Sequence, residues 1–175
     1  MTRVPIPFTN CPGGAIIQAE VFRESGTDGK IRIYGIRFSE ANRKSLQNVL
    51  QAVEKLTGHQ FSENVGVRFE TEYPGLAGES WELMLALGIA AELQNKPLNP
   101  KLTGTGKLDR YGYLEKVAGI PEKVQAAKQA GYSVFLVSTS QFEAVSEDGI
   151  RVVHVDTLER AWSIAKAIPT WRGYN

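Results

Sequence analysis

The stretch from Ser80 to Gln94 limits the possible folds of this chain more than any other part of the sequence, because its apolar side chains would lie nearly all round a helix. Its pattern predicts a helix, and a helix that is apolar all round must be covered on every side by the rest of the protein. Its apolar members are Trp81, Leu83, Met84, Leu85, Ala86, Leu87, Ile89, Ala90, Ala91 and Leu93. We therefore expect a central helix whose N-terminus, at Ser80, is shielded from solvent.

Before this helix, strand-like and helix-like patterns follow one another. Two β-rich runs, 15–22 and 30–36, flank a glycine-containing loop and predict an antiparallel hairpin. Apolar residues then recur every three or four positions between Ser39, a suitable N-cap, and Gly58, a suitable stop. This spacing predicts an amphipathic helix of about four to five turns. Alternation of apolar and polar residues over 65–72 predicts a half-buried strand.

After the central helix, the chain returns to strands and short helices. An irregular β stretch, 102–117, leads to a further helix over 120–130 with Pro121 in its first turn. The remaining pattern predicts two strands and one more helix, over 133–137, 151–155 and 157–167. The sequence therefore predicts the α+β class, as a single domain of mixed small sheets with three main helices.

Charge and cysteine content exclude several classes of function. The 20 Lys and Arg residues against 19 Asp and Glu leave a formal net charge of +1, so no strong field attracts nucleic acid or an anionic membrane. The single cysteine, Cys11, cannot form an internal disulfide, and two histidines do not make a Cys/His metal cluster. We therefore expect no metal site, no cofactor and no nucleic-acid partner.

The ends and the length of the chain lead to further expectations. Residues 1–7 lack the apolar core of a signal peptide, and the longest apolar run, 83–91, has nine residues, whereas a membrane-spanning helix needs about 20. We expect a cytoplasmic protein without a membrane partner. The 175 residues fit one domain, and no Gly-x-x-x-x-Gly-Lys-Ser/Thr phosphate loop occurs. An ATPase motor is therefore not expected within the chain.

Two side chains are candidates for chemistry, and each has a plain structural alternative. Ser80 stands at the start of the buried helix, where free N–H groups can stabilise an oxyanion, but serine is also a common helix cap. Lys123 lies in the first turn of a helix beside alanines, where burial lowers the pKa of a lysine. It can equally be a flanking lysine whose stem covers an apolar stripe. His59 and His154 share no motif, so a Ser-His-Asp site is the weaker alternative.

Two blocks of the sequence resemble a known family. The first is Gly-Glu-Ser at 78–80, ahead of the Ala- and Leu-rich helix, and it resembles the nucleophile segment of the Lon-type serine protease domain. The second, 105–131, is similar to that family's Thr-Gly … Gly … Gly-Gly … Glu-Lys … Ala-Ala … Ala-Gly pattern. The spacing agrees without a gap, with 25 residues from Ser80 to Thr105 and 43 from Ser80 to Lys123.

The resemblance covers nearly the whole chain and implies its organisation. It assigns 14–167 to a Lon-like proteolytic domain, 1–13 to an N-terminal extension and 168–175 to a C-terminal tail. The implied substrate is a peptide or an unfolded protein. The family also implies a homo-oligomer, a hexamer, and allows for a separate ATPase that supplies the substrate.

The resemblance also assigns roles to individual residues. Ser80 corresponds to the nucleophile and Lys123 to the general base of a Ser-Lys dyad, and Thr105 helps to hold the lysine. Gly78 and Glu79 correspond to the segment that supports the nucleophile and the oxyanion. The implied activity is that of an ATP-independent serine endopeptidase that forms an acyl-enzyme. We expect its rate to rise toward mildly alkaline pH as the lysine loses its proton.

Two residues depart from the family pattern, in which proline precedes the serine and Ala-Gly follows it. Glu79 replaces the proline, and we expect its carboxylate to raise the pKa of Lys123. Trp81 replaces the alanine, and we expect it to line the substrate groove; the alternative is an inward position beside Met84 and Leu85. A second interpretation of the chain is therefore a non-hydrolytic Lon-like binding or assembly module with an occluded site.

Overall fold

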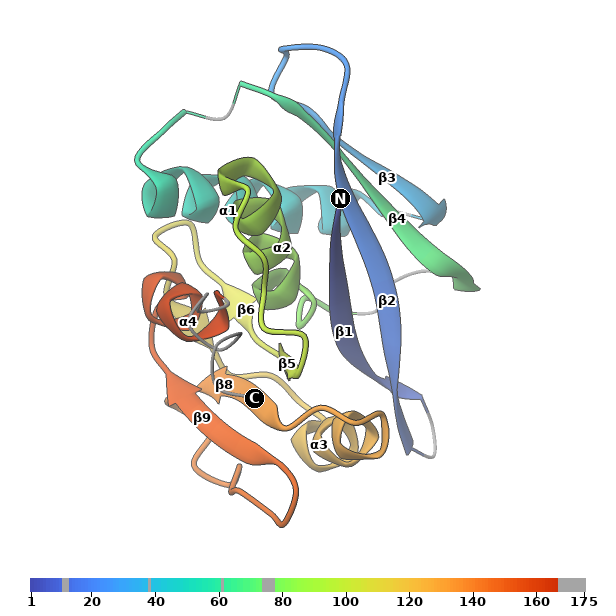
Figure 1. The fold of residues 1–175 in the computed structure, drawn as a ribbon, viewed down its shortest axis with the longest axis vertical. Coiled ribbons are helices and arrows are strands. Elements are labelled where there is room, and N and C mark those ends of the chain that lie inside the picture. The colour runs from blue at the N-terminus through green and yellow to red at the C-terminus, as the bar shows by residue number, and fades with distance from the viewer. Residues whose placement is uncertain (11–12, 38, 61, 74–77, 167–175) are drawn as a thin grey trace, which may run out of the picture.

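A computed structural model of the protein describes residues 1–10, 13–37, 39–60, 62–73 and 78–166, and Figure 1 shows its ribbon. The elements follow the order β1 (Thr2–Asn10), β2 (Gly13–Glu24), β3 (Ile31–Ile36), α1 (Glu40–Thr57), β4 (Asn64–Tyr73), α2 (Glu82–Gln94), β5 (Leu102–Gly104), β6 (Lys107–Leu108), β7 (Leu114–Glu115), α3 (Ile120–Gln129), β8 (Val134–Ser138), β9 (Arg151–Val155) and α4 (Leu158–Ala165). The tail expected at 168–175 and the single cysteine, Cys11, lie outside the described residues.

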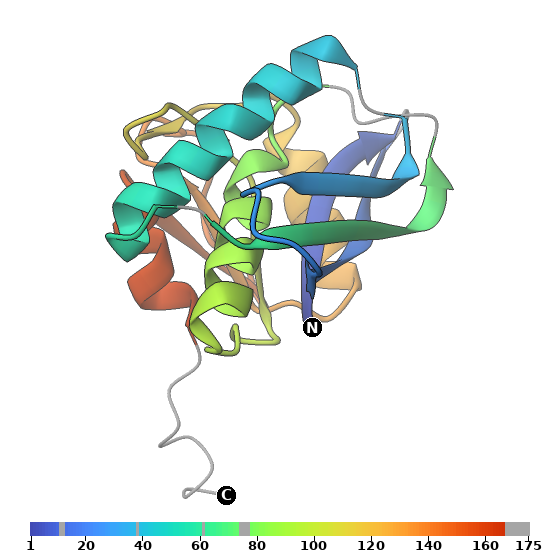
Figure 2. The same ribbon diagram turned by 90° about the horizontal axis from the view of Figure 1, so that it is seen from above.

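The larger sheet has the strand order β1-β2-β4-β3. β2 is antiparallel to both β1 and β4, whereas β3 is parallel to β4. The predicted hairpin of β2 with β3 is therefore wrong, because β4 lies between these two strands. A helical crossover explains the difference: the chain leaves β3, passes through α1 and returns as β4 beside β3. Figure 2 shows α1 crossing above α2 on one side of this sheet.

The first strand of this sheet comes from the segment expected to be an N-terminal extension. β1 pairs with β2 along its whole length, from Thr2 with Val21 to Asn10 with Gly13. Its inward side chains Val4 and Ile6 are fully buried. β1 also carries two prolines, which lack an N–H group, but it is an edge strand with one partner only, and prolines are tolerated there.

The C-terminal third forms a smaller parallel sheet with the order β5-β8-β9. The predicted strands and helices of this region are confirmed, with β8 and β9 followed by α4. β6 and β7 form a separate antiparallel ribbon. In Figure 1, α3 lies beside the lower ends of β1 and β2. Its buried side chains also share a hydrophobic cluster with Phe135, Val137 and Val152 of the smaller sheet, so α3 connects the two sheets.

α2 is the central helix, as its composition predicts. Every residue from Glu82 to Ala91 is buried, and α2 contacts α1, α4, β1, β2, β5 and β6. Gly88 allows β1 to approach closely, because a Cβ atom at this position would meet the side chain of buried Val4. The helix begins at Glu82 and not at Ser80, so Ser80 belongs to the turn that enters it.

The α+β class predicted from the sequence is confirmed. The described residues contain four helices and several small sheets around two hydrophobic clusters, the larger of which surrounds α2. None of the helices in this part of the chain is long and apolar enough to cross a membrane.

Trp81 lies in the core and not in a groove. Its side chain is 1% exposed and belongs to the same hydrophobic cluster as Met84 and Leu85. The indole Nε1 donates a hydrogen bond to the Gly78 carbonyl oxygen at 2.9 Å. The structure therefore corrects the expectation that Trp81 lines the substrate groove, and supports the inward alternative. A side chain buried to this extent cannot contact a substrate in this conformation.

Replacing Trp81 tests this placement through stability. We expect Trp81→Ala to lower the free energy of unfolding by about 3 to 5 kcal/mol, because it leaves a large cavity in the core. Trp81→Phe keeps an aromatic ring in the core and should lose less, about 1 to 2 kcal/mol. Urea denaturation of the three proteins measures both values. A loss below about 1 kcal/mol for the alanine variant contradicts the core position.

Candidate active site

The turn that carries Ser80 is fixed against the segment between β5 and β6. Gly78 begins the turn with φ of +71°, a left-handed conformation that glycine adopts without strain. The Ser80 carbonyl oxygen accepts a hydrogen bond from the Gly106 N–H group at 3.1 Å. In return, the Leu83 N–H group donates to the Gly106 carbonyl oxygen, also at 3.1 Å. This reciprocal pair sets the position of the half-buried serine.

Lys123 enters the site from the first turn of α3. Gly119 is the N-cap of this helix with φ of +75°, and the Lys123 N–H group donates to its carbonyl oxygen at 3.1 Å. A Cβ atom at Gly119 would also meet Thr9 of β1, so only glycine lets the helix start this close to the strand. The Lys123 side chain is 4% exposed, which is rare for a lysine.

Thr105 connects the two candidate residues. It follows β5 and is fully buried. Its Oγ1 accepts a hydrogen bond from Lys123 Nζ at 3.3 Å and donates one to the Ser80 carbonyl oxygen at 3.4 Å. Lys123 Nζ also donates to the Ala118 carbonyl oxygen at 3.0 Å. Hydrogen bonds thus join Lys123 to Thr105 and Thr105 to the backbone of Ser80, the three residues that the family resemblance assigns to one site.

Burial changes the acid-base behaviour of the lysine. Loss of solvent lowers the pKa of Lys123 from 10.5 to about 8, and nearby Glu122 opposes this shift with a smaller effect. The two hydrogen-bond partners of Nζ, at Thr105 and Ala118, are neutral oxygens. They stabilise the charged form of the lysine less than a carboxylate would, so they do not return its pKa to the value of a free lysine. At pH 7, a group with such a pKa is deprotonated in roughly a tenth of the molecules.

Glu79 is not the carboxylate that acts on Lys123. Its Oε2 lies 2.7 Å from Nζ of Lys107 on β6. The same Nζ atom also lies 3.7 Å from Oε2 of Glu115 on β7. The acidic residue that raises the pKa of Lys123 is Glu122, its neighbour in the chain. The expectation for Glu79 was wrong because β6 supplies a cation with which it pairs.

The first N–H groups of α2 are already hydrogen-bonded. The Glu82 N–H group donates to the Glu79 carbonyl oxygen at 3.2 Å, and the Leu83 N–H group donates to Gly106. These groups were expected to stabilise an oxyanion, and in this conformation they have other acceptors. A supporting or oxyanion-binding role of Gly78 and Glu79 stays a prediction.

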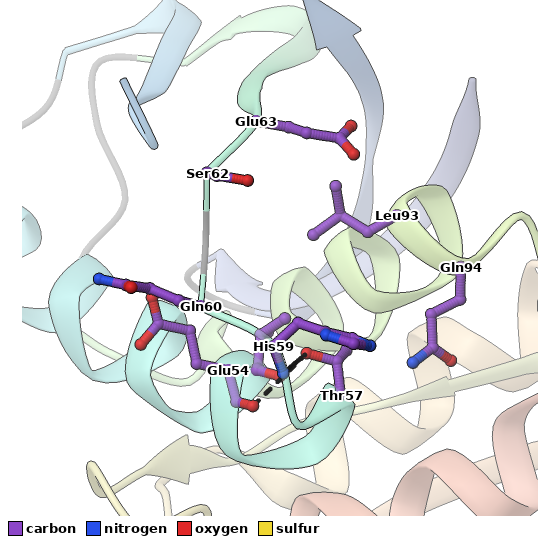
Figure 3. Close-up of a pocket in the computed structure, with 9 residues that line it drawn as sticks. Glu54, Thr57, His59, Gln60, Ser62, Glu63, Leu93 and Gln94 are labelled. Carbon is purple, nitrogen blue, oxygen red and sulfur yellow. Dashed lines mark hydrogen bonds between the residues drawn. The ribbon is translucent and has the colours of Figure 1, made fainter. Parts of the chain in front are cut away.

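A cavity of about 340 Å³ lies at the opposite end of α2. Figure 3 shows Thr57 and His59 from the end of α1 on one side of it, and Leu93 and Gln94 of α2 on the other. A helix rises about 1.5 Å per residue, so Leu93 lies roughly 16 Å along α2 from its first residue. This cavity is therefore separate from the site around Ser80.

The two histidines have surroundings of their own. His59 lines the cavity at the end of α1, and His154 Nε2 lies 2.9 Å from the Gln141 carbonyl oxygen. Neither interaction involves the turn that holds Ser80. Among the described residues, no group of three or more His, Cys, Asp and Glu side chains is arranged to hold a metal ion.

Three residues near the site were not singled out from the sequence. Ala118 offers a backbone carbonyl, which leaves no signal in a sequence. Gly14 of β2 lies so close to α3 that a Cβ atom would meet the Glu122 carbonyl oxygen, and its only signal is the adjacent glycine at 13. Glu82 was detectable, because it is the one charged residue in the apolar stretch 81–91.

Comparison with known proteins agrees with the resemblance. The chain is 29% identical over 141 residues to "Archaeal Lon protease" of Methanothermobacter thermautotrophicus, a match that covers 77% of this chain and 22% of that protein. The corresponding protein of Archaeoglobus fulgidus is 27% identical over 125 residues, covering 71% and 20%. "Lon protease 2" of Bacillus subtilis is 25% identical over 162 residues, covering 83% and 29%. No protein-family model matches the chain.

The chain spans about a fifth of the length of the archaeal relatives it matches. The matches extend over most of the chain, and the Lon-type resemblance seen in the sequence is confirmed by proteins from both archaea and bacteria. Over most of its length the chain is similar to one part of proteins named Lon protease, and this similarity supports a Lon protease domain.

Proposed function

We propose that this protein hydrolyses peptide bonds with Ser80 as the nucleophile and Lys123 as the general base. The observation that carries this proposal is the position of Lys123 Nζ, which is buried, bonded to neutral oxygens and linked through Thr105 to the backbone of Ser80. A lysine in such a place can be neutral near physiological pH, which is the form that can accept a proton. The relatives named Lon protease support a protease of this type.

The proposed reaction is acyl transfer in two halves. Neutral Lys123 accepts the proton of the Ser80 hydroxyl while Ser80 Oγ attacks the peptide carbonyl carbon. The protonated lysine then gives this proton to the departing amine as the C–N bond breaks, which leaves an acyl ester on Ser80. In the second half, Lys123 takes a proton from water and the hydroxide attacks the ester carbon. The bond from this carbon to Ser80 Oγ then breaks, the carboxylic acid product leaves, and Lys123 returns the proton to Ser80 Oγ.

Thr105 acts in this scheme as the residue that holds the base. Its hydroxyl fixes Lys123 Nζ without adding negative charge, so the lysine is oriented without being driven back to its charged form. The same hydroxyl is bonded to the Ser80 carbonyl oxygen. A single side chain therefore controls the distance between the base and the segment of the nucleophile.

The proposed substrate is a peptide or a flexible protein segment. None of the steps above uses a nucleotide, so we propose that cleavage of such a substrate is independent of ATP. A folded substrate first has to be unfolded, a task that we assign to a separate ATPase.

The dyad is tested by cleavage of a peptide library, read by mass spectrometry. We expect Ser80→Ala and Lys123→Ala each to reduce turnover to background, and the double variant to be no worse than either single one, because the two residues act as one unit. His59→Gln and His154→Gln serve as controls and should cleave like the wild type.

Three outcomes contradict the dyad: retained turnover in either single variant, losses that add up in the double variant, or a large loss in a histidine variant that keeps its circular dichroism spectrum. A wild-type protein that binds peptides but releases no fragments favours the non-hydrolytic module.

Thr105 has a matched control two residues earlier. Thr103 is also fully buried, but its hydroxyl donates to the Pro5 carbonyl oxygen at 2.9 Å. We expect Thr105→Val and Thr103→Val to lose similar stability, about 1 to 3 kcal/mol each. Only Thr105→Val should lower turnover, by about tenfold or more, because the base is no longer oriented.

The pH dependence of turnover shows whether Thr105→Val loses activity because Lys123 is no longer held or only because the protein is less stable. The Thr105 oxygen stabilises the charged form of Lys123 less than a carboxylate would but more than the valine side chain does, so Thr105→Val should move the midpoint of the rising limb to lower pH. In the wild type and in Thr103→Val, this limb should have its midpoint near the pKa of Lys123, about 8. Equal turnover and equal profiles in both variants contradict the role of Thr105.

A further inference from the structure

The first residue of α2, Glu82, is a buried carboxyl group that the proposed reaction does not use. Its side chain is 0% exposed. Oε1 accepts a hydrogen bond from the Leu108 N–H group of β6 at 3.1 Å. Oε2 is equally buried and has no hydrogen-bond partner among the described residues. Because buried polar atoms are almost always bonded, this half-satisfied carboxyl needs an explanation.

The charges around Glu82 favour its neutral form. The cation that faces it is Lys107 of β6, and this ammonium group is already paired with Glu79 in the turn before α2 and with Glu115 on β7. An ionised Glu82 would add a third carboxylate to one ammonium group. An unpaired buried anion also loses far more solvation free energy than an unpaired hydroxyl group.

The direction of the pKa agrees with this geometry. Burial raises the pKa of Glu82 from 4.5 to about 8, and the Leu108 hydrogen bond opposes the shift. Among its charged neighbours, Glu79 and Glu115 raise the pKa further and Lys107 lowers it. Glu82 therefore favours its protonated form in the folded protein at neutral pH.

The hydrogen bond of Glu82 lies within the contact that positions Ser80. Four hydrogen bonds join the entrance of α2 to the segment that ends in β6. Two connect the backbones around Ser80 and Gly106, one runs from the Thr105 hydroxyl to the Ser80 carbonyl oxygen, and one runs from the Leu108 N–H group to the Glu82 side chain. The same segment begins with Thr105, which holds Lys123. A change at Glu82 thus acts on a segment that contacts both members of the proposed dyad.

We propose that Glu82 is a positioning residue for Ser80: as a neutral carboxylic acid it holds the entrance of α2 against β6, and its ionisation draws water to the carboxylate and loosens this contact. The effect on catalysis rests on the proposed function of Ser80 and Lys123. Deprotonation of Lys123 then activates the site and ionisation of Glu82 loosens it, and because both pKa values are about 8, the turnover profile is a bell centred near pH 8. The protein would be active only in a narrow, mildly alkaline range.

The same ionisation has a defined effect on stability. Between pH 4.5 and about 8, Glu82 carries a proton in the folded protein and loses it on unfolding. Stability therefore falls as the pH rises through this range, and Glu82 adds no further slope above it, where both states are ionised. Glu82→Gln cannot ionise, so this part of the slope should be absent in the variant.

The proposal is tested by nuclear magnetic resonance on the full chain without substrate. The side-chain carboxyl carbon of Glu82 and the backbone amides of Ser80, Gly106 and Leu108 are followed from pH 4 to pH about 10, a range that spans the ordinary and the raised pKa of a glutamate. We expect all four signals to change with one midpoint near 8. In Glu82→Gln, which keeps an oxygen for the Leu108 N–H group, the amide transition should be absent.

Two further variants keep Glu82, so the proposal can be tested even if Glu82→Gln does not fold. Lys107→Met removes the facing cation and should move the Glu82 midpoint to higher pH. Glu115→Gln removes a facing carboxylate and should move it to lower pH. Shifts in these opposite directions support the proposed charge cluster, and the absence of both shifts overturns it.

Turnover provides the second measurement. The wild type should lose activity as the pH rises above about 8, the pKa of Glu82, while Glu82→Gln should reach a plateau there. A Glu82 midpoint near the ordinary 4.5, a high midpoint that leaves the three amides unchanged, or the same falling limb in both proteins overturns the proposal. If the wild type cleaves nothing at any pH, the proposed function fails, and the resonance titration still decides the role of Glu82 in the turn.

Discussion

The burial of α2 on every side is the constraint from which the site follows. The first N–H groups of a helix lack partners within the helix, and a buried helix start must find them elsewhere. Here the segment between β5 and β6 supplies a carbonyl oxygen at Gly106 for the Leu83 N–H group. That requirement places Thr105 beside Ser80, and Thr105 in turn holds Lys123 from α3. The candidate dyad is thus assembled by the need to satisfy a buried helix terminus.

The same lack of solvent sets the chemistry of the two ionisable groups at this terminus. It lowers the pKa of Lys123 and raises that of Glu82, so both groups favour the uncharged state more than they do in water. For Lys123, the shift corresponds to a free energy on the order of 3 kcal/mol. This is a considerable fraction of the stability of a domain. The fold therefore carries two buried ionisable groups at a stability cost, which is typical of functional sites.

The periodicity of apolar residues predicted the helices and most strands, because an element that buries one face has apolar residues at regular spacing in the sequence. Ser39 and Gly58 cap α1 as expected, with the Ser39 side chain bonded to the Asn42 N–H group. Strand pairing left no such trace. The loop between β2 and β3 suggested a hairpin, whereas the crossover through α1 places β4 between them. The prolines of β1 also concealed a strand, since proline is excluded from central strands but not from an edge.

At the candidate site, the sequence predicted the residue types but not their surroundings. Ser80, Thr105 and Lys123 came from a resemblance in spacing, and the structure brings them to one place. The direction of the Trp81 side chain and the partner of Glu79 depend on contacts between segments far apart in the sequence. Lys107 on β6 pairs with Glu79, and the core accepts the indole ring. Neither contact has a local signal.

The proposed mechanism depends on a lysine that can be neutral because it is buried, and a direct titration of this side chain tests that requirement. The protein is labelled with ¹³C at the lysine ε carbons, and the Lys123 signal is identified by its absence in Lys123→Ala. We expect a midpoint of about 8 for this signal, whereas the ordinary pKa of a lysine side chain is about 10.4. A Lys123 midpoint in the range of the exposed lysines would contradict the proposed mechanism, because a lysine that is fully charged at neutral pH cannot take the proton of Ser80.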